Sequence, residues 1–78
     1  MDFPFYTTDY IEAHDTAKKM THRAGGEGTN WIVWVCESGN RELYVVSPAS
    51  RGQPWGCEKS LEYKLAEDSR GYFVEQVF

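Results

Sequence analysis

Apolar residues first fall into a helical pattern, between about residue 9 and residue 24. They recur at alternating spacings of three and four residues, on one face of an α-helix: Tyr10, Ala13, Ala17, Met20 and Ala24. Asp9 predicts the N-cap and Glu12 completes a capping-box start, while Gly25 and Gly26 predict the end of the helix. Because this face is narrow and mostly alanine, we expect the helix to pack closely against a sheet.

The next pattern is continuous rather than periodic. Residues 31–36 are apolar at every position, which is typical of a strand that is covered on both faces. We therefore predict a central strand over about residues 31–37. Residues 38–40 (Ser-Gly-Asn) indicate a turn, and residues 41–47 are predicted to be the return strand of an antiparallel hairpin.

The second half of the chain allows two interpretations. Residues 57–66 are rich in helix-forming side chains, yet their apolar members alternate with polar neighbours as in a half-buried strand. We favour a strand over about residues 59–66, with a second helix over residues 57–66 as the alternative. The last strand is predicted over residues 72–78, after a hairpin loop.

These elements predict an α+β fold with one N-terminal helix on a small antiparallel β-meander of three to four strands. At 78 residues, the chain is expected to form one compact domain, residues 1–78. Residues 1–6 are expected to form an extended arm on the body, because Pro4 disfavours helix in the residue before it. Aromatic residues make up 15% of the chain, and their large buried area helps so short a chain to form a core.

Net charge narrows the range of partners. The formal charge is −4 and the sequence pI is near 5.0, whereas domains that bind nucleic acid through bulk positive charge usually have a pI above about 9. We therefore expect no direct nucleic-acid partner. No apolar run approaches the roughly 20 residues of a membrane span, so no membrane partner is expected. Without a basic segment and apolar run at its start, the protein is expected to be cytoplasmic.

Cysteine and histidine residues give no metal-site pattern. His14 and His22 are too far apart for a zinc-ligand pair, as are Cys36 and Cys57. No metal and no cofactor are expected, and both histidines are expected to be solvated. In the cytoplasm both thiols would be reduced, with Cys36 buried and inert. Two alternatives remain: a disulfide if the cysteines lie on neighbouring strands, and a reactive Cys57 thiolate if that residue begins a helix.

The candidate binding site lies around the loop of residues 48–56. This loop is dense in proline and glycine, and it contains Arg51 and Trp55, residue types that are enriched at binding hot spots. Loops held by a rigid sheet often bind partners. The predicted partner-binding residues are Arg51, Gln53, Trp55, Trp31 and Glu58.

No catalytic constellation accompanies this loop, so the sequence favours a binding protein over an enzyme. We expect a small non-enzymatic module that binds a larger protein or complex and blocks one of its surfaces. In size and charge alone it is like the inhibitors that phages and mobile elements encode against host defence, including anti-CRISPR and anti-restriction proteins. The alternatives are a self-associating accessory subunit, such as a homodimer, and a small thiol-based redox protein or enzyme that uses Cys57.

Overall fold

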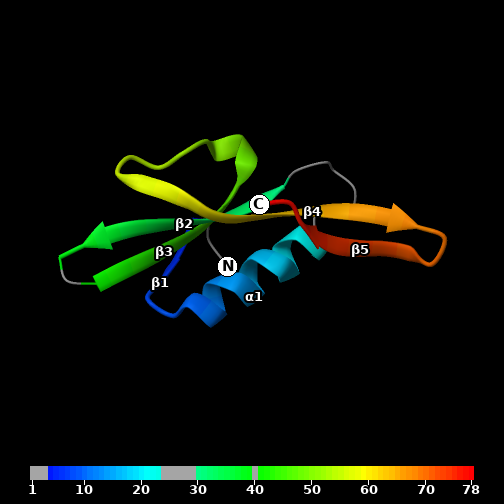
Figure 1. Cartoon of the computed structure of the whole chain (residues 1–78), viewed down its shortest axis with the longest axis horizontal. Helices are drawn as coiled ribbons and strands as arrows, with labels where there is room; N and C mark the ends of the chain where they lie inside the picture. Colours follow the sequence, from blue (N-terminus) through cyan, green and yellow to red (C-terminus); the bar gives the residue numbers. More distant parts are fainter. Residues whose placement is uncertain (1–3, 24–29, 40) are drawn as a thin grey trace.

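The computed structural model is an α-helix packed on a five-stranded antiparallel sheet (Figure 1). It describes residues 4–23, 30–39 and 41–78. The elements are, in chain order, β1 (Phe5–Thr7), α1 (Tyr10–Arg23), β2 (Trp31–Ser38), β3 (Arg41–Pro48), a 3₁₀ turn (Ala49–Arg51), β4 (Cys57–Asp68) and β5 (Gly71–Gln76). The α+β class and the N-terminal helix predicted from the sequence are confirmed.

The strand order in the sheet is β1-β3-β2-β4-β5, and every neighbouring pair is antiparallel. β2 is the middle strand, as its continuous apolar run predicts. The order departs from a meander because β4 pairs with β2 rather than with β3. The chain must therefore cross β2 between β3 and β4, and residues 49–56 make this crossing above the sheet in Figure 1.

α1 begins at the predicted cap. The Asp9 carboxylate accepts hydrogen bonds from the backbone N–H groups of Ile11 and Glu12 at 2.9 and 3.3 Å. The buried residues of α1 are all small, so the helix can lie close to the sheet. They are Ala13, Thr16, Ala17 and Thr21. Tyr10, which was predicted on this face, is instead 46% exposed at its margin. Ala24 and the predicted glycine stop lie outside the described residues.

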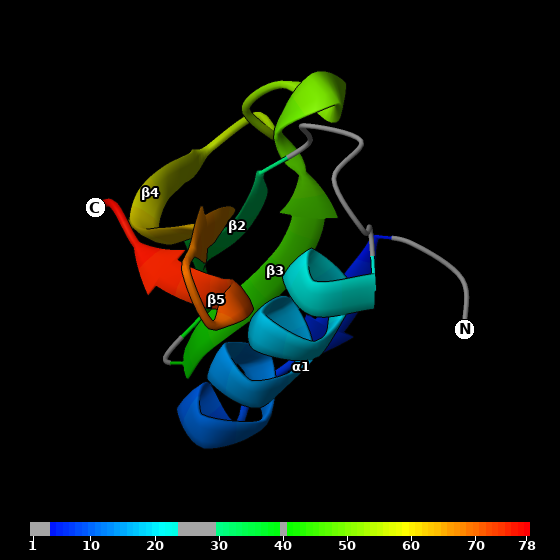
Figure 2. The ribbon, with the colours of Figure 1, turned by 90° about the vertical axis from the view of Figure 1, so that its right-hand side faces the viewer.

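The central strand contributes to a core on each face of the sheet. The core beneath α1 joins the helix alanines to Trp31, Val33, Val46, Leu61 and Tyr63. The core on the opposite face contains Ile32, Trp34, Val45 and Cys57. Figure 2 shows α1 on one side of the twisted sheet, beside β5 and β3. Both faces of β2 are therefore covered, one by a helix and the other by a loop.

Strand pairing explains two departures from the predicted elements. Residues 1–6 were predicted to be an extended arm on the body, and within this segment and one residue beyond it Phe5–Thr7 is a fifth strand, because it pairs with β3 from Phe5↔Val46 to Thr7↔Tyr44. β4 begins at Cys57, two residues earlier than predicted, because its pairing with β2 reaches Cys36↔Cys57. That pairing also decides between the two interpretations of residues 57–66 in favour of the strand.

Candidate functional site

A disulfide bond joins Cys36 of β2 to Cys57 of β4. The two residues lie directly opposite each other in the strand pairing, with Cα atoms 4.3 Å apart. The expectation of reduced thiols is therefore wrong, because the pairing that brings these residues together is not visible in any local sequence pattern. The bond also removes the free thiol that a reactive Cys57 would require.

Trp55 stands at the corner of the turn that leads into β4. The Cys57 N–H donates to the Pro54 carbonyl oxygen at 3.3 Å and closes a four-residue turn. Gly56 is the third residue of this turn, and its φ of 76° is the left-handed conformation that a type II turn requires there. Trp55 is 99% exposed, so its indole ring points to solvent instead of covering the core.

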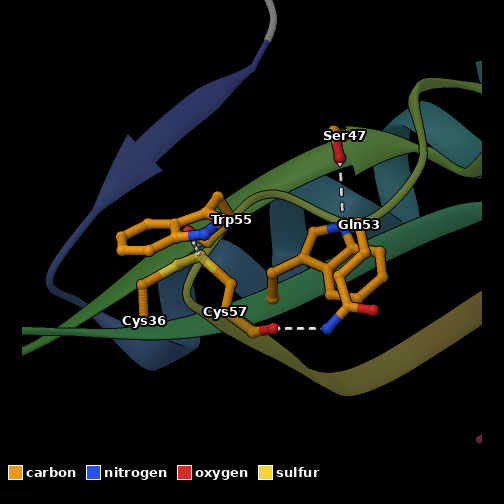
Figure 3. The surroundings of a disulfide bond; sticks show 6 residues. Cys36, Ser47, Gln53, Trp55 and Cys57 are labelled. Atoms are coloured by element: carbon orange, nitrogen blue, oxygen red, sulfur yellow. Dashed lines mark hydrogen bonds between the residues drawn. A yellow bond between two sulfur atoms is a disulfide. The ribbon is translucent and has the colours of Figure 1, made fainter.

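Hydrogen bonds and packing fix the loop on both sides of Trp55 (Figure 3). Where the loop starts, the Ala49 N–H donates to the Asn30 carbonyl oxygen at 2.8 Å. Before β4, the Gln53 side-chain amide donates to the Cys57 carbonyl oxygen at 2.6 Å. Beneath the loop, the Trp34 indole N–H donates to the Ser47 hydroxyl at 3.1 Å in the second core. The loop is therefore anchored at its start, at Ala49, and again just before β4, at Gln53.

A hollow of about 470 Å³, which we name the loop groove, lies between this loop and the sheet face opposite α1. Tyr6, Leu43 and Val45 contribute apolar surface from β1 and β3. The loop contributes Arg51, Gln53 and Trp55, and the disulfide adds both of its cysteines. Three of the five predicted site residues are therefore brought together around one apolar groove.

The other two predicted residues lie elsewhere. Trp31 is only 7% exposed in the core beneath α1, because alternation along β2 turns it to the helix side. Glu58 pairs with Val35, on the α1 face of the sheet, and lines a separate hollow with Glu37 and Glu42. Neighbouring residues of a strand point to opposite faces. Because Cys57 faces the loop groove, Glu58 faces away from that groove.

Sequence reasoning missed the apolar side of the loop groove. Leu43 and Val45 lie within the apolar run of residues 43–46, and the two-residue period of a strand places both on one face of the sheet. Tyr6 had no such signal, since it joins the groove only through the pairing of Tyr6 with Val45. Tyr6 is 59% exposed, so the groove has an exposed aromatic ring on each of two sides.

Three side chains with displaced pKa values lie outside the loop groove. A hydrogen bond to Glu42 and, to a smaller extent, burial raise the pKa of the Tyr44 phenol. Burial raises the pKa of the Tyr63 phenol, whose hydroxyl bonds to the His14 ring. A hydrogen bond from Lys59, and then one from Asn30, lower the pKa of the Glu62 carboxyl. Each of these shifts follows from burial and hydrogen bonds within the fold.

The contact between His14 and Tyr63 corrects a further expectation. His14 is half-buried beside the helix alanines, and its ring nitrogens face the Tyr63 hydroxyl. A buried tyrosine hydroxyl needs such a partner, whereas His22 is exposed as expected. Within residues 4–23, 30–39 and 41–78, no group of three His, Cys, Asp or Glu side chains is placed to hold a metal ion.

Comparison with protein-family models, with curated proteins and with solved structures finds no match to this chain. No helix in the described part of the chain is long and apolar enough to cross a membrane. The functional argument therefore rests on the loop groove and on the surfaces around it.

Proposed function

We propose that this protein is a non-enzymatic binding module that engages a larger protein through the loop groove. The observation that supports this most is Trp55, which is 99% exposed on a loop tied down on both sides. An aromatic side chain so exposed adds nothing to the core, and tryptophan and arginine are the residue types that dominate binding energy at interfaces. Trp55 and Arg51 form the centre of the proposed contact.

The fixed loop favours binding for an energetic reason. A loop that is already ordered loses little conformational entropy when a partner binds, so more of the contact energy appears as affinity. The disulfide and the bond between Gln53 and Cys57 supply this order next to Trp55. The groove volume of about 470 Å³ suits an apolar side chain from the partner, inserted between Tyr6 and Trp55. The mode of action would be steric occlusion of the partner's surface.

The disulfide indicates the kind of compartment in which the protein would bind such a partner. Disulfides persist in oxidising compartments and are rare in the cytosol, so the bond between Cys36 and Cys57 favours a partner outside the reducing cytoplasm. A more specific version of the proposal is that the protein inhibits a cytoplasmic defence complex. The small size and acidic charge of the chain support this version. The binding role of the loop groove holds in either compartment.

Affinity capture with matched variants tests the proposed function. Tagged wild-type protein, the double variant R51A/W55A and the control I11A are used as baits in a bacterial lysate without reducing agent. Ile11 is 69% exposed on α1, which packs on the face of the sheet opposite the loop groove, so I11A removes an exposed apolar side chain elsewhere. We expect at least one protein to be captured by wild type and I11A, with recovery about tenfold lower for R51A/W55A.

Two results would contradict the proposed function. One is equal recovery of the same protein by wild type and R51A/W55A, which would place the contact elsewhere. The other is that wild type captures nothing that an empty resin does not. The captured protein is then purified, and its affinity for each variant is measured by titration calorimetry, so that a loss of recovery is assigned to binding rather than to stability.

A further inference from the structure

The outer edge of β5 is open to strand pairing. β5 lies at one end of the sheet, and no other described strand pairs with its outer side. Natural sheets protect such edges with charged side chains, especially lysine, and with proline, a bulge or a very short strand. β5 (Gly-Tyr-Phe-Val-Glu-Gln) has six residues without lysine or proline, and its one charged side chain, Glu75, pairs with Lys64 of β4. The opposite edge is protected, because β1 has only three residues and follows Pro4.

A concentration of positive charge lies beside this open edge. Lys18, Lys19, His22 and Arg23 of α1 line a hollow of about 420 Å³ together with Val74 of β5, and we name it the basic hollow. α1 lies next to β5 in the turned view (Figure 2). The chain has a formal charge of −4 and only eight Lys and Arg residues, yet three of these eight line this hollow.

The cations of the basic hollow form no ion pair with the described carboxylates. Lys59, Lys64 and Arg70 each form an ion pair with a carboxylate. By contrast, Lys18, Lys19 and Arg23 form no ion pair with a described carboxylate, and the Lys18 ammonium lies over the Tyr63 ring, 5.9 Å from its centroid. Cations near a helix C-terminus stabilise the helix dipole, but that role does not require them to border an open strand edge.

We propose that the outer edge of β5 and the basic hollow together bind an extended acidic segment of a partner protein, which adds to the sheet as a further strand. Main-chain hydrogen bonds to β5 would hold the segment, as in other cases of strand addition. Alternate side chains of an extended chain point to the same face. Its acidic side chains would face the basic hollow, and those between them would pack against Phe73, which is 41% exposed on the other face.

Charge argues against a second copy of this chain as the occupant. Two β5 strands paired about a twofold axis would keep both helices on the same face of the joined sheet. The two basic hollows would then approach each other, and repulsion between like charges disfavours this. This surface is separate from the loop groove, which lies on the opposite face of the sheet between β1, β3 and the loop. The two proposals therefore stand or fall independently.

Short synthetic peptides test the inference. The probe is a capped six-residue peptide of alternating glutamate and valine, and the comparison peptides replace glutamate by lysine or a central valine by proline. Each is titrated into the isotope-labelled protein, with chemical shifts and amide hydrogen exchange followed by NMR. We expect the acidic peptide to shift resonances of β5 and the end of α1, to slow exchange of β5 amides, and to bind about tenfold more tightly than either comparison peptide.

Charge reversal supplies the matched variants. R23E alters the basic hollow, and R41E makes the same charge change at the exposed start of β3. We expect R23E to lower the affinity for the acidic peptide about tenfold. R41E should keep this affinity within about twofold of the wild-type value. The inference is overturned if the acidic peptide does not bind at millimolar concentration, if it binds R23E as tightly as wild type, or if β5 instead mediates dimerisation of the free protein at low salt.

Discussion

At the scale of single residues, the three tryptophans have three different roles. Trp31 packs beneath α1, Trp34 bonds to Ser47 beneath the loop, and Trp55 is in solvent. Composition alone treats them as one aromatic surplus, whereas the structure assigns two to cores and one to the surface. Of the three tryptophans, only Trp55 has an exposed ring, and that ring adds nothing to either core.

The contrast between Trp31 and Trp55 leads to a stability prediction. W31A removes a side chain that is 7% exposed in a packed core, so we expect it to lower the free energy of unfolding by about 3–5 kcal/mol. W55A removes a fully exposed ring, and we expect a change below about 0.5 kcal/mol. Urea denaturation followed by far-UV circular dichroism measures both. A large loss of stability in W55A would show that Trp55 has a structural role and would weaken the proposed function.

Glu62 leads to a prediction about pH. Its carboxylate accepts hydrogen bonds from Lys59 at 2.7 Å and from Asn30 at 2.6 Å, which hold its pKa below the ordinary value of 4.5. The unfolded chain therefore takes up this proton before the folded protein does as the pH falls. The contribution of the Glu62 charge to stability is complete above about pH 4.5 and is lost as the pH falls through the lower folded pKa.

The variant E62Q isolates this effect. We expect it to be about 1 kcal/mol less stable than wild type near pH 7, with the difference shrinking as the pH falls below about 4. Denaturation midpoints measured over this pH range give the comparison. E67Q is the control, because Glu67 is exposed and forms no ion pair with another described residue. A difference between wild type and E62Q that stays constant across the range would refute the pKa argument.

At the scale of elements, the disulfide stabilises the pairing of β2 with β4. It closes a loop between residues 21 positions apart and restricts the unfolded chain accordingly. We expect reduction, or the double variant C36A/C57A, to lower the free energy of unfolding by about 3 kcal/mol. Urea denaturation with and without reductant measures the loss, and reductant should leave C36A/C57A unchanged. Free thiols in the protein as isolated under air would contradict the bond itself.

Local sequence patterns were sufficient to predict most elements. The helix, the central strand and its hairpin partner each follow from side chains near one another in sequence, as does Asp9 as the cap. Sheet order was not predictable in this way, because the pairing of β4 with β2 depends on contacts between distant segments. The disulfide, the fifth strand and the apolar side of the loop groove all depend on such pairing.

The candidate site was predictable to a similar degree. Arg51, Gln53 and Trp55 could be found because breakers mark the loop and these residues lie within it. Trp31 was predicted to bind a partner, but it is buried beneath α1, because an all-apolar strand does not show what covers each face. Glu58 was expected in the loop region, and the two-residue period of β4 places it on the other face once that strand begins at Cys57.

At the scale of the whole molecule, the two proposed binding surfaces lie on opposite faces of one sheet. The loop groove occupies the β1–β3 half, and the basic hollow borders the β5 edge. The molecule measures 46 Å along its longest axis and 24 and 22 Å across it. An elongated domain with such separated surfaces can contact two regions of one large partner, or two partners, without either contact excluding the other.

The crossing from β3 to β4 also constrains the order in which the strands can pair during synthesis. During synthesis, β2 and β3 can pair as soon as they emerge, but β4 follows only after residues 49–56. Until then one side of the most apolar strand is an unprotected edge, the kind of surface from which aggregation starts. Once β4 has paired with β2, the bond between Cys36 and Cys57 holds the two strands together, so an oxidising environment would prevent this edge from being exposed again.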